Sequence, residues 1–142
     1  MNYRTTVSAV IKNTHTNKYL LVKQPKNIGV YPGLWAIPGG GINQGETMYQ
    51  ALSRECLEEV GLKIFNITPL RFSDAVREKH HADGTQETTY MIFLVFTCET
   101  DTDKVILNHE AESHAWVELK DVFSYDLNPP TQETFEKLKN NN

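Results

Sequence analysis

Apolar and polar residues alternate near the start of the chain. Within residues 5–12 the alternation has a period of two, which predicts a strand with one buried face. The residues expected to face the core are Val7, Ala9 and Ile11. A polar turn leads into residues 19–23, which predict the returning strand of a hairpin. After a loop rich in proline and glycine, residues 34–37 predict another short strand.

Residues 48–60 predict a helix whose two ends are marked in the sequence. Thr47 is placed to be the N-cap, and Gln50, three residues later, completes a capping box. Gly61 suits the left-handed conformation that ends many helices. One helix face carries an apolar stripe formed by Met48, Leu52, Cys56 and Val60.

Two strand-like segments in the second half of the chain predict a long hairpin. Residues 62–72 show an imperfect strand pattern, and residues 87–97 are rich in aromatic and β-branched side chains. The polar segment 73–85 joins them through an Asp-Gly turn and gives the hairpin a basic rim. Residues 115–117 predict a further short strand.

The C-terminal residues predict a helical turn over 118–123 and a last helix capped by Thr131. Phe135 and Leu138 supply the apolar contact of that helix. Because strands outnumber helices and are interleaved with them, the expected class is α/β, with a mixed sheet covered by helices. The length of 142 residues suits one domain spanning residues 1–142.

Composition narrows the range of partners. The net charge of −4 argues against polymeric nucleic acid, although bound divalent cations can still attract a small anion. Cys56 and Cys98 are too few for a disulfide framework and predict buried thiols in a reducing, cytoplasmic compartment. The N-terminal residues lack an apolar signal core and no apolar run is long enough to span a bilayer, so no membrane association is expected.

The stretch from Gly40 to Leu62 carries the candidate chemistry. Glu55, Glu58 and Glu59 cluster within roughly a third of the predicted helix circumference, and Glu59 falls inside the apolar stripe. A carboxylate half-buried against a core is unfavourable unless a positive group satisfies it. Residues 39–41 are all glycine, so their backbone can approach a ligand closely. Converging carboxylate and carbonyl oxygens are the ligands of hard cations such as Mg²⁺.

Three other interpretations, namely solvated glutamates, an ordinary or nucleotide-binding glycine loop and a histidine metal site, account for the sequence less well. Glutamates on a helix most often face solvent, but this does not account for Glu59. The glycine run alone is compatible with an ordinary turn, and it lacks the spacing of a dinucleotide site and the lysine of a Walker loop. His80 and His81 are adjacent on a predicted strand, so they point to opposite faces and do not predict a metal site.

The spacing of these residues resembles the signature of the Nudix hydrolases. Gly40 is followed after five residues by Glu46 and after seven more by RECLEEVGL, residues 54–62. Cys56 departs from the aliphatic residue that is usual in the family. Further segments resemble a branch of nucleoside triphosphatases that prefers pyrimidine deoxynucleotides. They are residues 31–35, 72–74, 82–84, 90–92, 115–117 and 125–128. The chain departs from this branch at Pro38, where the branch carries serine.

This resemblance implies a Nudix fold, in which a mixed sheet is sandwiched between helices, and Mg²⁺ as cofactor with Mn²⁺ as an alternative. The ligands that it implies are the Gly39 carbonyl, Glu55, Glu58 and Glu59. Arg54 and Glu46 are implied as an ion pair that orients helix and loop. A further catalytic carboxylate is expected in the loop before Trp116, where Glu110 is the first choice and Glu112 the second.

The implied reaction is attack of water at phosphorus of a nucleoside triphosphate, which releases a monophosphate and pyrophosphate. Glu55 or Glu110 accepts the proton, and the sequence leaves this choice open. A nucleotide-sugar hydrolase and an inert nucleotide-sensing module are the alternatives. The presence of all three helix glutamates favours the triphosphatase.

Candidate substrate contacts are aromatic residues for stacking on the base and basic residues for the phosphates. The aromatic candidates are Trp35, Phe72 and Tyr90, and the basic candidates are Arg71, Arg77 and Lys79. Aromatic residues on strands usually belong to the core, and basic residues on a hairpin rim are usually solvated. The resemblance also implies a homodimer.

Overall fold

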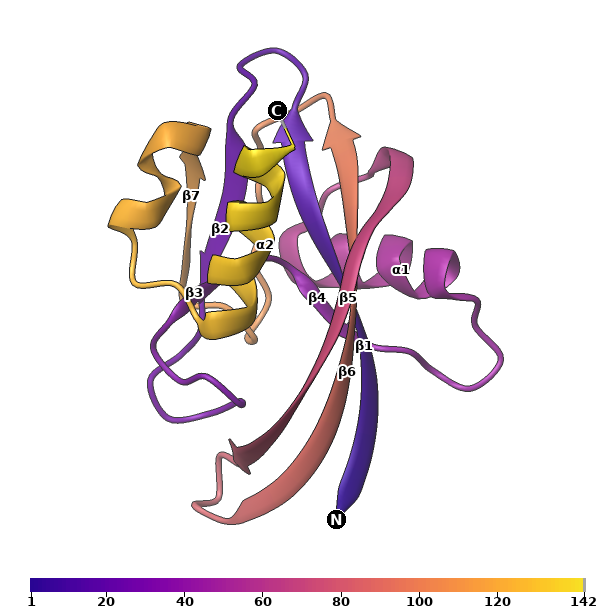
Figure 1. Ribbon diagram of the computed structural model, residues 1–142, viewed down its shortest axis with the longest axis vertical. Helices are drawn as coiled ribbons and strands as arrows, with labels where there is room; N and C mark the ends of the chain where they lie inside the picture. The colour runs from indigo at the N-terminus through magenta and orange to yellow at the C-terminus, as the bar shows by residue number, and fades with distance from the viewer. Residues whose placement is uncertain (142) are drawn as a thin grey trace.

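A strongly twisted mixed β-sheet forms the centre of the protein (Figure 1). The computed structural model describes residues 1–141. Its elements in chain order are β1 (Asn2–Asn13), β2 (Tyr19–Lys23), β3 (Trp35–Ala36), β4 (Gly39–Gly41), α1 (Met48–Val60), β5 (Phe65–His80), β6 (Gln86–Thr100), β7 (Ser113–Val117), the 3-10 helix η1 (Leu119–Ser124) and α2 (Pro129–Asn140).

Strand β1 is the central strand of this sheet. It runs parallel to β6, from Asn2 opposite Thr89 to Asn13 opposite Thr100. On its other side it pairs with β4 and, at its end, with β2, both antiparallel. The long hairpin of β5 and β6 is antiparallel and places β5 at one edge of the sheet.

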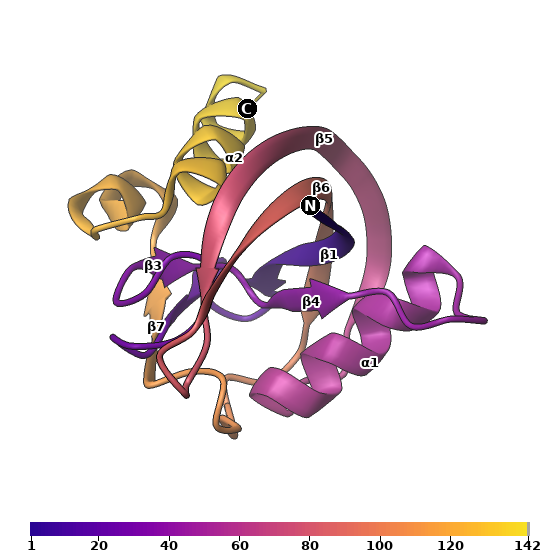
Figure 2. The same cartoon turned by 90° about the horizontal axis from the view of Figure 1, so that it is seen from below.

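Helices α1 and α2 lie on opposite sides of the sheet, as Figure 2 shows. The core on the α1 side joins Val7, Ala9 and Ile11 of β1 to buried residues of the helix, such as Leu52. The core on the α2 side is a separate cluster around Phe135. The predicted α/β class is therefore confirmed. Within residues 1–141, neither helix is long and apolar enough to cross a bilayer.

Helix α1 begins and ends as the sequence predicts. The Thr47 hydroxyl accepts a hydrogen bond from the Gln50 amide at 3.1 Å, and the Gln50 side chain accepts one from the Thr47 amide at 2.9 Å. Gly61 ends the helix in the left-handed region, with φ of 69°. Cys56 and Cys98 are free and buried, as expected.

Three parts of the fold differ from the sequence prediction. Strand β5 continues through the polar segment to His80, because β6 supplies backbone partners over that whole length. The glycines of residues 39–41 form strand β4 rather than a turn. Helix α2 begins at Pro129, and its cap is Asn128, whose side chain accepts the Thr131 N–H at 2.9 Å. Proline suits this first helical turn because the N–H that it lacks has no helical partner there.

Replacement of Thr47 by alanine removes one half of the capping box. We expect Thr47→Ala to lower the free energy of unfolding by about 1 kcal/mol, because the amide of Gln50 loses its acceptor. Urea denaturation measures this loss, and Thr47→Ser, which keeps the hydroxyl, serves as the control. Equal stability of all three proteins would show that the cap does not stabilise α1.

Candidate active site

Two glutamates of α1 lie against the glycine strand β4. The Gly39 amide donates a hydrogen bond to Oε2 of Glu59 at 3.1 Å. A Cβ atom added to Gly40 would overlap with the carboxylate of Glu55. Glycine is therefore required at position 40 because the Glu55 carboxylate occupies the place of a side chain.

The loop between β6 and β7 brings a third carboxylate to this place. The Asn108 amide donates to the Glu59 carbonyl at 3.1 Å, which fastens the loop to the end of α1. The Asn108 side chain then accepts from the Glu110 amide at 2.9 Å. As a result, one carboxylate oxygen each of Glu55, Glu59 and Glu110 lie within 4.8 Å of one another. We call these three residues the carboxylate cluster.

The second candidate of this loop, Glu112, lies elsewhere. Its carboxylate pairs with Lys23 at 3.5 Å, and its amide donates to the Lys23 carbonyl at 2.8 Å. Of the two loop glutamates, the structure brings only Glu110 into the carboxylate cluster.

Arg54 connects the helix, the loop before it and strand β4. Its guanidinium donates to both oxygens of Glu46, at 2.6 and 2.9 Å, and to the Gly41 carbonyl at 2.9 Å. It also reaches Oε1 of Glu55 at 2.9 Å. The structure thus contains the Arg54–Glu46 pair that the sequence predicts, and Arg54 fixes the Glu55 carboxylate as well.

Glu58 is not one of the three converging carboxylates, but it shares the Arg54 guanidinium with Glu55. Its side chain is 56% exposed and pairs with Arg54 at 3.2 Å. An exposed pair of this kind contributes little to stability, so the side chain can exchange this partner for another cation.

Burial makes the charged form of the cluster unfavourable. It raises the pKa of Glu59 to about 8, with the neighbouring charges of Glu110 and Glu55 acting in the same direction against the Gly39 hydrogen bond. Burial also raises the pKa of Glu55, although Arg54 acts in the opposite direction. The Glu46 pKa is lowered, because the carboxylate accepts hydrogen bonds from Arg54 and Asn43.

The cluster has the properties of a site for a hard divalent cation. Three carboxylates converge, and among the basic side chains that the structure describes only Arg54 contacts them, through Glu55. Oxygen ligands of this number and charge suit Mg²⁺ or Mn²⁺, and a bound cation would relieve the unfavourable burial of Glu59.

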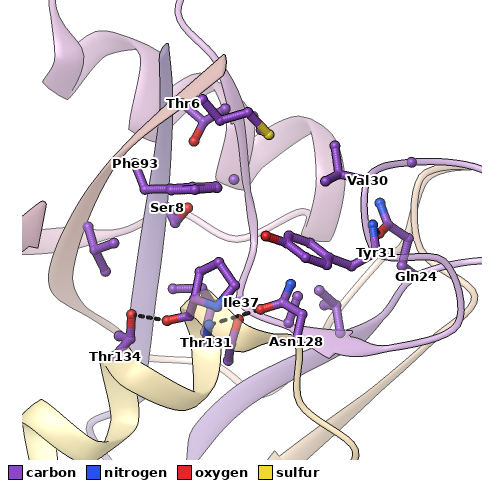
Figure 3. Close-up of a pocket in the computed structure, with 18 of the residues that line it drawn as sticks. Thr6, Ser8, Gln24, Val30, Tyr31, Ile37, Phe93, Asn128, Thr131 and Thr134 are labelled. Atoms are coloured by element: carbon purple, nitrogen blue, oxygen red, sulfur yellow. Dashed lines mark hydrogen bonds between the residues drawn. The ribbon is translucent and has the colours of Figure 1, made fainter. Parts of the chain in front are cut away.

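A cavity opens beside the cluster and extends towards the first turn of α2 (Figure 3). Glu59 and Glu110 border it at one end, and Asn128 and Thr131 border it at the other. Its walls come from strands β1 and β6 and from the loop after β2. Figure 3 shows the side chains of this wall, including Thr6, Ser8, Gln24, Tyr31 and Phe93.

The family model that matches this chain is that of the NUDIX domain, over residues 2–138. The chain belongs to the Nudix family. Among curated proteins it is 45% identical over 136 residues to the nucleoside triphosphatase NudI of Escherichia fergusonii and equally to that of Escherichia coli K12. Each match covers 94% of this chain and 95% of the relative.

Solved Nudix structures share the fold at lower identity. The MutT protein from Methanosarcina mazei superposes with a TM-score of 0.73 at 24% identity, covering 99% of this chain and 95% of that one. The Nudix domain of Shewanella oneidensis NrtR, solved with ADP-ribose, gives 0.76 at 21% identity, covering 99% and 89%. These likenesses confirm the expected Nudix fold.

Two of the aromatic residues predicted to contact the substrate lie on the face of the sheet opposite this cavity. Strand neighbours alternate between faces, and the cavity is lined by Met91, Phe93 and Val95 of β6. Tyr90 therefore lies on the opposite face, as does Phe72, which pairs with Leu94 and is 81% exposed.

Three of the other predicted contacts, Trp35, Arg71 and Arg77, are also outside the cavity lining. Trp35 packs edge-on against Tyr125, with ring centroids 5.0 Å apart. Arg71 is held by Thr134 and Glu133 of α2, at 3.1 and 3.0 Å. The other basic candidates were Arg77, which donates to the Tyr31 hydroxyl at 3.1 Å, and Lys79, whose side chain lies outside the described part of the structure.

Polar positions of β1 are the site residues that the sequence analysis missed. Thr6 and Ser8 alternate with the core residues, and the sequence places them opposite the buried face, yet they line the cavity. Arg4, which precedes the predicted strand, lines it as well. Thr6 is only 6% exposed. Both faces of β1 are covered because β1 is a central strand of the sheet. Its central position depends on pairing with β6, which the sequence does not show.

Titration of Glu59 gives a test of the buried cluster. The pKa of Glu59 in the folded protein is about 8 and lies above that in the unfolded chain. The contribution of protonated Glu59 to the free energy of unfolding is therefore complete at acid pH and is lost as pH rises towards 8. In the presence of a chelator, we expect wild type to lose on the order of 3 kcal/mol relative to Glu59→Gln between pH 5 and pH 8.

Urea denaturation at several pH values measures this difference. The glutamine is the matched control, because its shape is retained and it does not titrate. Parallel stability profiles for the two proteins would contradict the proposed burial of an uncompensated charge at position 59.

Proposed function

We propose that this Nudix protein hydrolyses nucleoside triphosphates, with a preference for pyrimidine deoxynucleotides, to a nucleoside monophosphate and pyrophosphate. The observation that carries the proposal is the carboxylate cluster at the end of a cavity. The names of the 45% identical relatives support the triphosphatase activity. The pyrimidine preference is carried by the sequence resemblance alone.

The proposed cofactor is Mg²⁺, with Mn²⁺ as a substitute. Glu55, Glu59 and the Gly39 carbonyl would hold it, and Glu58 would join them after leaving Arg54. When bound, the cation supplies neutralisation of phosphate charge and a lower pKa for an attacking water. Arg54 keeps Glu55 and the Gly41 carbonyl in place around that site.

Water attacks phosphorus, the anhydride bond to the pyrophosphate breaks, and the water gives up a proton. Glu110 is favoured over Glu55 as the acceptor, because its side chain makes no ion pair with any side chain that the structure describes, whereas Glu55 is bound to Arg54. A free carboxylate beside the reacting water can accept the proton without breaking an existing contact.

A hydrolysis assay with Mg²⁺ across the common ribo- and deoxynucleoside triphosphates and several nucleotide sugars tests this function. We expect turnover of triphosphates and highest activity on pyrimidine deoxynucleotides. Glu59→Gln should reduce kcat beyond the roughly 10- to 100-fold typical of residues that only support a metal ligand. Glu112→Gln is the matched control on the same loop, because Glu112 pairs with Lys23 outside the cluster.

Each outcome of this assay has a definite meaning. Turnover of nucleotide sugars without triphosphates would assign the chain to the sugar hydrolases. Nucleotide binding without any turnover would assign it a sensing role. Equal rates for wild type and Glu59→Gln would place the reaction outside the carboxylate cluster.

We further propose a cytoplasmic location, which suits two free buried thiols, and a homodimer. The face of the β1–β6–β5 sheet that points away from the cavity exposes four large side chains. These are Tyr3, Phe72, Val76 and Ile92, exposed by 78%, 81%, 48% and 37%. Apolar side chains gathered on one face are typical of a protein interface.

Phe72→Glu tests this surface, because it places a charge in the middle of the apolar face. We expect light scattering to report a dimer for wild type and a monomer for the variant. Leu57→Glu, which changes an exposed apolar residue of α1, should leave the dimer intact. A monomeric wild type, or a dimer in Phe72→Glu, would contradict the proposed contact.

A further inference from the structure

Arg4 is the one basic residue among the described residues that line the cavity. It lies on β1 opposite Met91 and on the same strand face as Thr6 and Ser8. Its guanidinium passes over Gly41: a Cβ atom on that glycine would lie 3.4 Å from Nε and 3.6 Å from Nη2 of Arg4. The bare backbone of β4 therefore leaves room for this side chain.

The guanidinium of Arg4 differs from those of the other arginines in the chain. Arg54 and Arg71 form ion pairs with glutamates, and Arg77 donates to Tyr31. Among the described residues, which leave out the Lys79 side chain, the guanidinium of Arg4 has neither a hydrogen-bond partner nor an ion-pair partner. Its five donors are thus available to a ligand in the cavity.

The position of Arg4 relative to the carboxylate cluster points to the kind of ligand. Gly39 binds Glu59, and Gly41 lies two residues further along β4, roughly 7 Å away at the rise of a strand. The guanidinium of Arg4 therefore lies beside the proposed metal site without being one of its ligands. A ligand that spans the two places carries negative charge over more than one group, as a polyphosphate does.

We propose that Arg4 binds a phosphate of the substrate, at a place next to the one held at the carboxylate cluster. The planar guanidinium suits two parallel hydrogen bonds to phosphate oxygens. Arg4 then orients the triphosphate along β4 with the reacting phosphorus at the cluster. This inference rests on the proposed function, since it assumes a substrate with a phosphate chain.

Calorimetric titration with inorganic tripolyphosphate in the presence of Mg²⁺ tests the assignment without requiring turnover. We expect Arg4→Gln to weaken binding by about 10- to 100-fold, the factor for losing a hydrogen bond to a charged group. Arg4→Lys keeps the charge without the planar fork and should show a smaller loss. Lys12→Gln, which removes one charge from the same strand outside this cavity, should bind as wild type.

Kinetics separate a binding role from a structural one. Loss of a contact made throughout the reaction raises KM for the triphosphate while kcat is little changed. Equal tripolyphosphate affinity of Arg4→Gln and wild type would overturn the assignment, as would an equal loss in Lys12→Gln. Circular dichroism melting of Arg4→Gln and Arg4→Lys checks the fold. An inactive wild type that still binds tripolyphosphate through Arg4 would refute the proposed function but not the phosphate contact.

Discussion

The hydrogen bonds of Arg54 are the constraint on which the active site depends. One side chain joins Glu46 of the loop, the Gly41 carbonyl of β4 and the Glu55 carboxylate of α1. Carboxylates brought this close repel one another, and burial adds to the penalty. Removal of the guanidinium would leave Glu46 and Glu55 without their compensating charge and would remove the hydrogen bond that joins Gly41 of β4 to the helix. The hydrogen bonds of Arg54 that stabilise the local fold therefore also hold the carboxylates close together, as a cation site requires.

Strand β1 serves the core and the cavity through its two faces. Val7, Ala9 and Ile11 pack towards α1. On the opposite face of the strand, Thr6 and Ser8 line the cavity. This division is possible because β1 is central and has a layer on each side. A surface strand with the same alternation would place its polar residues in solvent.

The parts of the fold that the sequence predicts well are those set by nearby residues. The bounds of α1 follow from Thr47, Gln50 and Gly61, which all act within one helical turn of its ends. The burial of Glu59 follows from helical spacing. The faces of β5 and β6 could not be predicted in this way, because they depend on register with β1. For this reason Phe72 and Tyr90 are expected at the substrate from the sequence, whereas the structure places them on the face of the sheet opposite the cavity. Glu110 enters the site through a loop that is fastened to α1 by Asn108, a contact without a sequence pattern.

The separation of chemistry from substrate recognition in this chain has a physical basis. The proposed metal ligands need a fixed spacing of a few ångströms, and a short helix against a glycine strand provides it within residues 39–59. A nucleotide is larger than such a unit, so its other contacts must come from elements that are distant in the sequence. In the cavity they come from β1, the loop after β2, β6 and the start of α2. Changes in any one of these four segments can alter the choice of substrate while the carboxylate cluster and Arg54 stay in place.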